Sequence, residues 1–378
     1  MEHRPSSVKR LYSRHGGGAS PHNTRRRGTM STESMLPLAF RALAVEDAGG
    51  PIIAQERRIE RLAEDEVLVR VDYASINAMD AGLARRNLFQ LPAPYVLGFD
   101  FSGEVAALGA HNPLGLQVGD QVFGANERGG GFGQYIAVKN KAERIAKRGL
   151  IPAREASTYG IAFLTAYESL MIATDIGRHR GKWIYVAGAG GGVGHFAAQI
   201  AKLHGLRVIG SAGKPETLGL LREIGLDAVI DYTQQDVVAE VRRITGGGAA
   251  VVYDSTYRQA SYEQSVATIA SGGEYIRLAS DYQLRQFGLE DLSEVIYARG
   301  ATLTIADLGR YSSDPQFIAR MPLVAQGYER AVEWYASGAL RPIITKAVPF
   351  DAAALDEALA DFGGGKINVG KVVVEVRG

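Results

Sequence analysis

One segment in the middle of the chain restricts its possible folds more than any other. The apolar run Trp183-Ile-Tyr-Val-Ala187 leads directly into the glycine-rich stretch Gly188-Ala-Gly-Gly-Gly-Val-Gly194. A helical pattern then continues from His195 to His204. A strand that passes through glycines into a helix is the context in which a glycine string indicates dinucleotide binding. The segment therefore predicts a strand–turn–helix unit of a nucleotide-binding sheet.

The glycines of this segment suit a pyrophosphate group. They let the backbone approach the ligand closely, and the unpaired amides and dipole at the helix start attract an anion. The alternative is a tight turn that packs helix against sheet and binds no ligand. The residues predicted to contact the cofactor here are Gly188, Gly190, Gly191, Gly192 and Val193.

The strand after the helix distinguishes between the two nicotinamide cofactors. A site for NAD is expected to carry Asp or Glu about 20 residues past the first glycine. The strand Leu206-Arg-Val-Ile-Gly-Ser211 instead ends without an acid, and Lys214 follows. Ser211 can donate to a 2′-phosphate and Lys214 attracts it, so NADPH is the predicted cofactor. Lys214 could instead be a solvated lysine at a helix start.

The rest of the chain divides by its patterning. From about residue 151, strand and helix patterns alternate, beginning with a helix predicted over Pro152–Met171. Such alternation predicts an α/β fold with a doubly wound parallel sheet covered on both faces. Residues 36–150 carry short β-branched runs between Gly and Pro residues, which indicate a compact β-rich or barrel-like unit. Pro342–Val376 returns to short strands and one helix, and we expect it to rejoin that unit.

Composition excludes several kinds of site. The 378 residues are 46% hydrophobic and 22% charged, as in ordinary soluble globular proteins. No run reaches the ~18 apolar residues that a membrane span needs, so we expect no membrane partner. The chain has no cysteine, so disulfides, thiolate metal ligands and a cysteine nucleophile are all excluded.

The first 34 residues differ in composition from the remainder. Residues 1–30 hold seven Lys or Arg and one acid, a net charge of +6, which leaves −5 for the rest of a chain of net charge +1. We expect residues 1–34 to be a disordered basic extension. A transit peptide, a nucleic-acid-binding arm and an upstream extension before a start at Met30 or Met35 are alternatives, and we favour the last. The mildly acidic body argues against nucleic acid as the main partner, and we expect a cytoplasmic protein.

Several short motifs, taken in order, resemble the medium-chain dehydrogenase/reductase superfamily, and most of all its zinc-independent branch of quinone oxidoreductases and zeta-crystallin. The resemblance implies a GroES-like catalytic domain over residues 35–157, a Rossmann domain over 158–339, a return to the catalytic domain over 340–378, and a homodimer by analogy. The motifs are Ile76-Asn-Ala-Met-Asp80, Leu97-Gly-Phe-Asp-Phe-Ser-Gly-Glu-Val105, Gly119-Asp-Gln-Val-Phe-Gly124, Thr165-Ala-Tyr167, the glycine turn, Asp231-Tyr232 and Gly370-Lys-Val-Val-Val374.

The resemblance also implies how the zinc positions are filled. The places of the Cys, His and Cys ligands of zinc-dependent relatives are matched by Asn77, by Phe99 with Asp100 beside it, and by Ile161. These residues do not form a Cys/His zinc set, so no metal is predicted. Without a Lewis acid to stabilise an alkoxide, the expected reaction is hydride transfer to a small apolar conjugated carbonyl compound, a quinone or an enone.

The remaining site residues come from the resemblance alone. Asn77 is the candidate catalytic residue, donating to the substrate carbonyl or the cofactor, although it could merely stabilise a turn. Thr165 and Tyr167 match residues that border the nicotinamide ribose, and Tyr232 matches one that flanks the adenosine phosphate. Lys366 and Asn368 match a loop that closes over the cofactor. Each could instead be an ordinary surface or packing residue, and no proton donor is assigned.

Two other functions stay open. One is a 2-enoyl-thioester reductase acting on acyl-CoA or acyl-carrier-protein substrates, which a basic patch from Arg85, Arg86 and Arg128 would favour. The other is a non-catalytic NADPH-binding protein of the crystallin kind. Turnover of varied acceptors would distinguish an enzyme from the binding protein.

Overall fold

The structure is a computed structural model that describes residues 36, 38–87, 89–278, 290–366 and 369–377. The described residues belong to one compact unit. The predicted basic extension of residues 1–34 lies outside the described residues. None of the described helices is long and apolar enough to cross a membrane.

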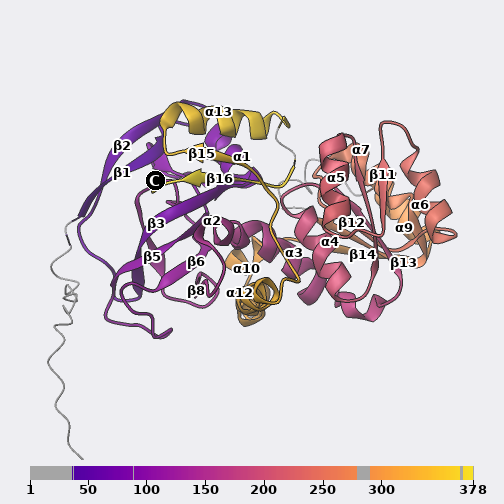
Figure 1. The fold of residues 1–378 in the computed structure, drawn as a ribbon, viewed down its shortest axis with the longest axis horizontal. Coiled ribbons are helices and arrows are strands. Elements are labelled where there is room, and N and C mark those ends of the chain that lie inside the picture. The colour runs from indigo at the N-terminus through magenta and orange to yellow at the C-terminus, as the bar shows by residue number, and fades with distance from the viewer. Residues whose placement is uncertain (1–35, 37, 88, 279–289, 367–368, 378) are drawn as a thin grey trace, which may run out of the picture. The chain divides into compact units, whose positions relative to one another are not determined.

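The β-rich part is built on one large mixed sheet (Figure 1). In order across it, the strands are β15 (Ile344–Pro349), β16 (Lys371–Glu375), β3 (Glu66–Ile76), β5 (Asp100–Leu108), β6 (Gln121–Ala125) and β8 (Ile145–Lys147), with β7 (Tyr135–Lys139) also paired to β3. A smaller sheet has the order β2 (Ile52–Ile59), β1 (Leu38–Val45), β4 (Tyr95–Val96). Helices α1 (Ala78–Arg86) and α13 (Ala352–Gly363) pack against each other beside these sheets.

The C-terminal strand β16 is the feature of this sheet that matters most for the site. It runs antiparallel to β3, with Val372 opposite Ile76. Its valines are fully buried and anchor it in the apolar core of the β-rich part. The pairing places Lys371, the first residue of β16, beside the end of β3, where Asn77 begins α1.

The second part is a parallel sheet with helices on its faces, and the predicted α/β class with a doubly wound sheet is confirmed. Its order is β11 (Ala228–Asp231), β10 (Arg207–Ala212), β9 (Trp183–Ala187), β12 (Ala249–Asp254), β13 (Ile269–Leu278), β14 (Thr302–Ala306). Strand order reverses between β9 and β12, and ligands of such sheets bind outside the carboxyl ends of the strands at that point. The helices are α4 (Gly194–Leu203), α5 (Pro215–Glu223), α6 (Val237–Thr245), α7 (Gln259–Val266), α9 (Glu290–Ala298), α10 (Arg310–Ser313), α11 (Pro315–Ile318) and α12 (Met321–Ala336).

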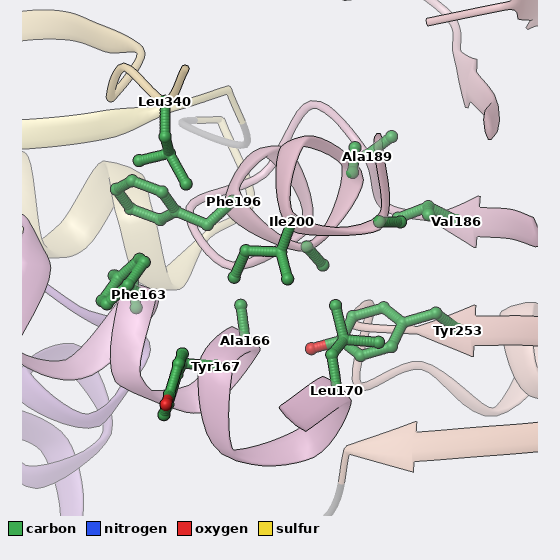
Figure 2. Packing of buried hydrophobic residues seen from close by; sticks show 14 of the residues in the cluster. Phe163, Ala166, Tyr167, Leu170, Val186, Ala189, Phe196, Ile200, Tyr253 and Leu340 are labelled. Carbon is green, nitrogen blue, oxygen red and sulfur yellow. The ribbon is translucent and has the colours of Figure 1, made fainter. Parts of the chain in front are cut away.

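The core on one face of this sheet holds the two segments that flank the glycine turn. Val186 on β9 and Ile200 on α4 are fully buried and belong to the same apolar cluster as Phe163 and Tyr167, part of which Figure 2 shows. Apolar residues of α4 recur at helical spacing on this side, which is why the helix forms and docks here. The packing fixes both ends of the turn that joins β9 to α4.

The single helix predicted over Pro152–Met171 is wrong in its continuity. The segment forms α2 (Ala153–Ala156), the π-helical turn η2 (Tyr159–Phe163), α3 (Leu164–Tyr167) and the π-helical turn η3 (Glu168–Ile172). The hydroxyls of Ser157 and Thr158 donate to backbone carbonyls three residues earlier, which competes with helix continuation. In η2 the amide of Ile161 instead donates to the Asp100 carboxylate at 2.7 Å, so this opening joins the helix to the β-rich part.

Candidate functional site

The glycine turn between β9 and α4 has a backbone that side chains would block. Gly188 has φ +76°, a left-handed conformation that favours glycine. A Cβ on Gly194 would lie 2.0 Å from the Gly188 carbonyl oxygen, so Gly194 must lack a side chain for α4 to begin so close to the strand. The amide of Gly191 donates to the same carbonyl at 2.8 Å and closes the turn.

This turn fits a dinucleotide pyrophosphate. The amides of Gly192 and Val193 have no hydrogen-bond acceptor within the described part of the chain. They stand at the start of a ten-residue helix, where unpaired amides and the helix dipole favour an anion. The predicted residues Gly188, Gly190, Gly191, Gly192 and Val193 therefore form one continuous cradle, and their contact with a cofactor stays a prediction.

His195, which the sequence analysis did not single out, locks this cradle in place. It is fully buried, and its Nδ1 donates to the Gly191 carbonyl at 2.8 Å. Its Nε2 must then accept from the amide of Ile343 at 3.2 Å, so the ring is neutral. Burial lowers the pKa of His195 to about 4, which keeps it neutral at physiological pH. A second clamp is the bond from the Gly370 amide to the Gly190 carbonyl at 2.7 Å.

Three predicted nucleotide-binding residues gather at the carboxyl ends of β10 and β11. The amide of Tyr232 donates to the Ala212 carbonyl, and its ring lies against Gly213. The hydroxyl of Ser211 is 2.9 Å from that of Tyr185 in the sheet interior. Lys214 is exposed at the position that caps the start of α5. The structure thus places Ser211, Lys214 and Tyr232 close together, and their roles remain predictions.

A buried polar network lies where β3, β5 and β16 meet. The Asn77 side-chain amide donates to Asp100 Oδ2 at 3.0 Å, and its Oδ1 accepts from the Lys371 ammonium at 2.5 Å. Lys371 also donates to the carbonyl of Ile76 at 3.1 Å and lies 3.3 Å from Asp100 Oδ2. Its side chain is 3% exposed and that of Asp100 is 0% exposed. The network is therefore a desolvated ion pair between Lys371 and Asp100, and the side-chain amide of Asn77 is hydrogen-bonded to both members.

Two further residues complete this network. Ser75 donates to Asp100 Oδ2 at 2.7 Å. Asp80 is fully buried and accepts from the amides of Asn77 and Gly98, at 2.8 Å each. Burial raises the pKa of Asp80 to about 7, although both hydrogen bonds oppose the shift. Burial also lowers the pKa of the Lys371 ammonium, against the attraction of Asp100 and Asp80.

The positions that match the ligands of zinc-dependent relatives do come together here. Asp100, the residue beside the matched position Phe99, links the other two: it accepts from the Asn77 side chain and from the backbone amide of Ile161. Their chemistry does not suit zinc, which prefers sulfur and imidazole nitrogen. The side-chain atoms that converge are an amide and a carboxylate, and the Lys371 ammonium within hydrogen-bond distance of both would repel a metal ion. Among described residues, no group of three His, Cys, Asp or Glu could hold a metal.

The other predicted site residues have different surroundings. The hydroxyl of Thr165 donates to the carbonyl of Ile161, one turn earlier. Tyr167 packs against Phe163 in the core, as Figure 2 shows. Lys366 is exposed and pairs with Asp361 at 2.8 Å, and Asn368 lies outside the described residues.

Sequence reasoning missed Lys371 and His195 as members of the site. Lys371 lay within the quoted motif Gly370-Lys-Val-Val-Val374, but nothing in the sequence tells that it reaches a residue 294 positions earlier. His195 directly follows the glycine turn, and a histidine there can bond back to the turn. That position was the one available signal.

Two family models match the chain, one on each structural part. Residues 63–148 match "Alcohol dehydrogenase GroES-like domain" and residues 192–321 match "Zinc-binding dehydrogenase". A quinone oxidoreductase from Homo sapiens is 24% identical over 246 residues, 64% of this chain and 73% of the relative. An NAD-dependent alcohol dehydrogenase from Sulfolobus acidocaldarius is 26% identical, covering 89% of this chain and 100% of the relative. A 2-methylene-furan-3-one reductase from Solanum lycopersicum is 30% identical, covering 66% and 64%.

The two family matches identify an oxidoreductase of a class that binds a nicotinamide cofactor, and the fold agrees with them. The two family models match in this order along one chain, and together they identify the particular family. The protein belongs to the medium-chain dehydrogenase/reductase superfamily, with quinone oxidoreductases and an enone reductase among its relatives.

Proposed function

We propose that the protein is an NADPH-dependent, zinc-free reductase of quinones or α,β-unsaturated carbonyl compounds. The observation that carries this proposal is that Asn77, at a position matched to a zinc ligand, is instead held by the buried Asp100 carboxylate and the Lys371 ammonium. An enzyme with this set has no metal ion to stabilise an alkoxide, so simple alcohol oxidation is disfavoured. An acceptor that is already activated by conjugation does not require that help.

The cofactor, when bound, would supply the hydride, while the protein positions it and excludes water. The glycine cradle would hold the pyrophosphate, and the residues at the ends of β10 and β11 would hold the adenosine end. Ser211 and Lys214 favour the 2′-phosphate of NADPH there, since a cation attracts it. The neighbouring Asp231 turns its carboxylate to the amide and hydroxyl of Thr233, at 2.9 and 2.6 Å.

The printed names of two relatives support the proposed substrate class. The human relative is named for quinones and the tomato relative for an enone. The relative from Sulfolobus is named as an NAD-dependent alcohol dehydrogenase, so the experiment has to test both the acceptor and the nucleotide.

The deciding experiment follows the near-ultraviolet absorbance of NADPH or NADH with a panel of acceptors. The panel contains ortho- and para-quinones, alkenals and enoyl-CoA esters. Simple alcohols are tested in the direction of oxidation, and every reaction is run with and without a chelator. We expect turnover of quinones or alkenals with NADPH, unchanged by the chelator. Preference for enoyl-CoA esters would favour the thioester reductase, and tight NADPH binding without turnover would favour the binding protein. Chelator-sensitive alcohol oxidation with NAD would contradict the proposal.

Reversing the charge at Lys214 tests the nucleotide preference. In Lys214→Glu, the carboxylate would repel the 2′-phosphate but would leave NADH, which lacks it, unaffected. We expect KM for NADPH to rise roughly 10- to 100-fold, since close charge pairs at binding sites contribute about 1.5 kcal/mol or more. Initial rates at varied nucleotide concentration measure the effect.

Lys182→Glu is the matched control for this change. Lys182 is also exposed, but it precedes β9 at the amino end of the same sheet, away from the carboxyl ends of the strands. Its KM for NADPH should stay within about twofold, because an exposed charge that far away is screened. An equal rise of KM in both variants would show that Lys214 acts only through the net charge.

A further inference from the structure

Lys371 lies against the glycine cradle and also belongs to the Asn77 network. Its stem runs past the turn, where a Cβ on Gly192 would lie 3.2 Å from Lys371 Cδ. Its ammonium ends 2.5 Å from Asn77 Oδ1. The preceding Gly370 is bonded to Gly190, so the backbone that carries Lys371 is fixed to the cradle. The lysine is therefore placed by both parts of the fold.

The ammonium group of Lys371 has no spare capacity for another partner. It has three donors, and the structure gives it three acceptors: the carbonyl of Ile76, the amide oxygen of Asn77 and the carboxylate of Asp100. A buried ammonium that is fully bonded within the protein acts through the groups it holds. Lys371 is thus suited to positioning rather than to direct contact with a substrate.

The group that Lys371 holds is the amide of Asn77, whose two ends are chemically distinct. Because an ammonium can only donate, Oδ1 must face Lys371 and Nδ2 must face the Asp100 carboxylate. In the inverted orientation, Nδ2 would face the Lys371 ammonium, which is also a donor, and Oδ1 would face the Asp100 carboxylate, which is also an acceptor. The lysine and the carboxylate together therefore impose one orientation on the side chain of the candidate catalytic residue.

We propose that Lys371 is a positioning residue of this site: its ammonium neutralises the buried Asp100 carboxylate and fixes the orientation of the Asn77 amide. The kinetic part of this inference rests on the proposed function, while its parts on stability, zinc and amide orientation do not.

The test uses the full chain in four forms: wild type, Lys371→Met, Asp100→Asn and the double variant. Lys371→Met alone leaves Asp100 buried without its counter-charge, so we expect a large fall in thermal stability. In the double variant neither residue carries a charge. The asparagine introduced at position 100 can donate a hydrogen bond, and the side-chain amide of Asn77 can invert so that its oxygen accepts that bond. We therefore expect most of the lost melting temperature to return. Lys139→Met removes a half-buried lysine of β7 that pairs with Asp65, and it is the control that should change little.

Three readouts separate positioning from a merely structural role. Selective ¹⁵N labelling of asparagine follows the Asn77 side-chain amide, whose signal is assigned by its loss in Asn77→Ser. We expect a shifted, exchange-protected pair of signals in wild type and a clearly different pair in the double variant. We expect kcat of the double variant to stay about 100-fold low, with KM for NADPH within about threefold, because misplacement of about 1 Å can cost that much. Mass spectrometry after dialysis against zinc should find no stoichiometric metal in wild type.

Each contrary result overturns a stated part of the proposal. If kcat and the Asn77 signals recover together with the melting temperature, Lys371 does not position the amide. Additive stability effects of the two single changes would show that the Lys371–Asp100 pair is not a unit. Stoichiometric zinc whose removal abolishes the Asn77 signals would show that a metal ion, and not the Lys371 ammonium, holds the Asn77 amide. If wild type reduces no acceptor, the proposed function fails, yet the stability, zinc and amide measurements still decide the role of Lys371.

Discussion

Placing an alanine at Gly194 should lower the free energy of unfolding by about 3 kcal/mol or more, and should weaken binding of the proposed cofactor NADPH by about tenfold or more. The added Cβ would lie 2.0 Å from the carbonyl oxygen of Gly188, where no real contact is tolerated. The neighbouring atoms are also backbone, so no side chain can move aside. Overpacking of this kind typically costs about 1–3 kcal/mol, or more when the backbone must shift. Urea unfolding gives the stability, and quenching or transfer of NADPH fluorescence gives the affinity.

The loss of affinity follows from the same displacement. To relieve the contact, α4 must move away from β9, which carries the amides of Gly192 and Val193 out of the cradle. Those amides are the groups we expect to bind the pyrophosphate. A variant with normal stability but weak NADPH binding would still support the cradle, whereas a variant normal in both would contradict it.

Gly219→Ala is the matched control for this change. Gly219 lies within α5 of the same sheet, and a Cβ there would meet nothing within 4 Å. Alanine in a helix interior is more favourable than glycine by about 0.5–1 kcal/mol, so the control should be slightly more stable than wild type. Its NADPH affinity should not change. Opposite signs of the two glycine-to-alanine changes would exclude a general intolerance of the domain.

How far the fold and the site can be predicted depends on the sequence distance between the interacting residues. The glycine turn is local: strand, glycines and helix lie within about twenty residues, and their order alone indicates a nucleotide-binding unit. Strand and helix alternation likewise predicts the doubly wound sheet, because each element carries its own period. The strand–turn–helix unit and the doubly wound sheet are confirmed, while nucleotide binding by the turn stays a prediction.

The continuity of the predicted helix over Pro152–Met171 failed for a tertiary reason. Nothing in the local pattern reveals that the amide of Ile161 leaves the helix to bond Asp100, 61 residues earlier. The gain from satisfying a buried carboxylate outweighs the cost of a few irregular turns. Propensity alone cannot weigh a partner that lies elsewhere in the chain.

The same limit applies to the site. Asn77 and Asp100 were matched to known positions, but their partner Lys371 arrives by the return of the chain to β3. A lysine in a β-strand is usually solvated, and only the pairing of β16 with β3 makes it the buried cation of the site. For that reason the sequence predicted that zinc ligands were missing, but it did not predict what replaces them.

Acid should destabilise the protein through His195 more than through an ordinary surface histidine. The folded pKa of His195 is lowered to about 4, against a usual value of 6.5, because the ring is buried. The unfolded state therefore binds more protons between these values, so stability is fully present above about pH 6.5 and is lost as pH falls toward about pH 4. A difference of this size between the pKa values of the folded and unfolded states corresponds to about 3 kcal/mol of stability. The protonated ring would also have no lone pair left to accept from the Ile343 amide.

His195→Gln isolates this contribution from the other groups that titrate in the same range. Glutamine offers one donor for the Gly191 carbonyl and one acceptor for the Ile343 amide, but it does not titrate. Urea unfolding from about pH 7 to about pH 4 should show the wild-type free energy falling about 3 kcal/mol further than that of the variant. His204→Gln, at the end of the same helix, is the control and should follow the wild-type curve. Asp80 and Glu168, whose burial raises their pKa values to about 7, act in the opposite direction but are common to all three proteins and cancel in the comparison. If wild type and His195→Gln lose stability in parallel, His195 is either protonated in the folded protein or not buried as described, and the cradle would then be held by some other contact.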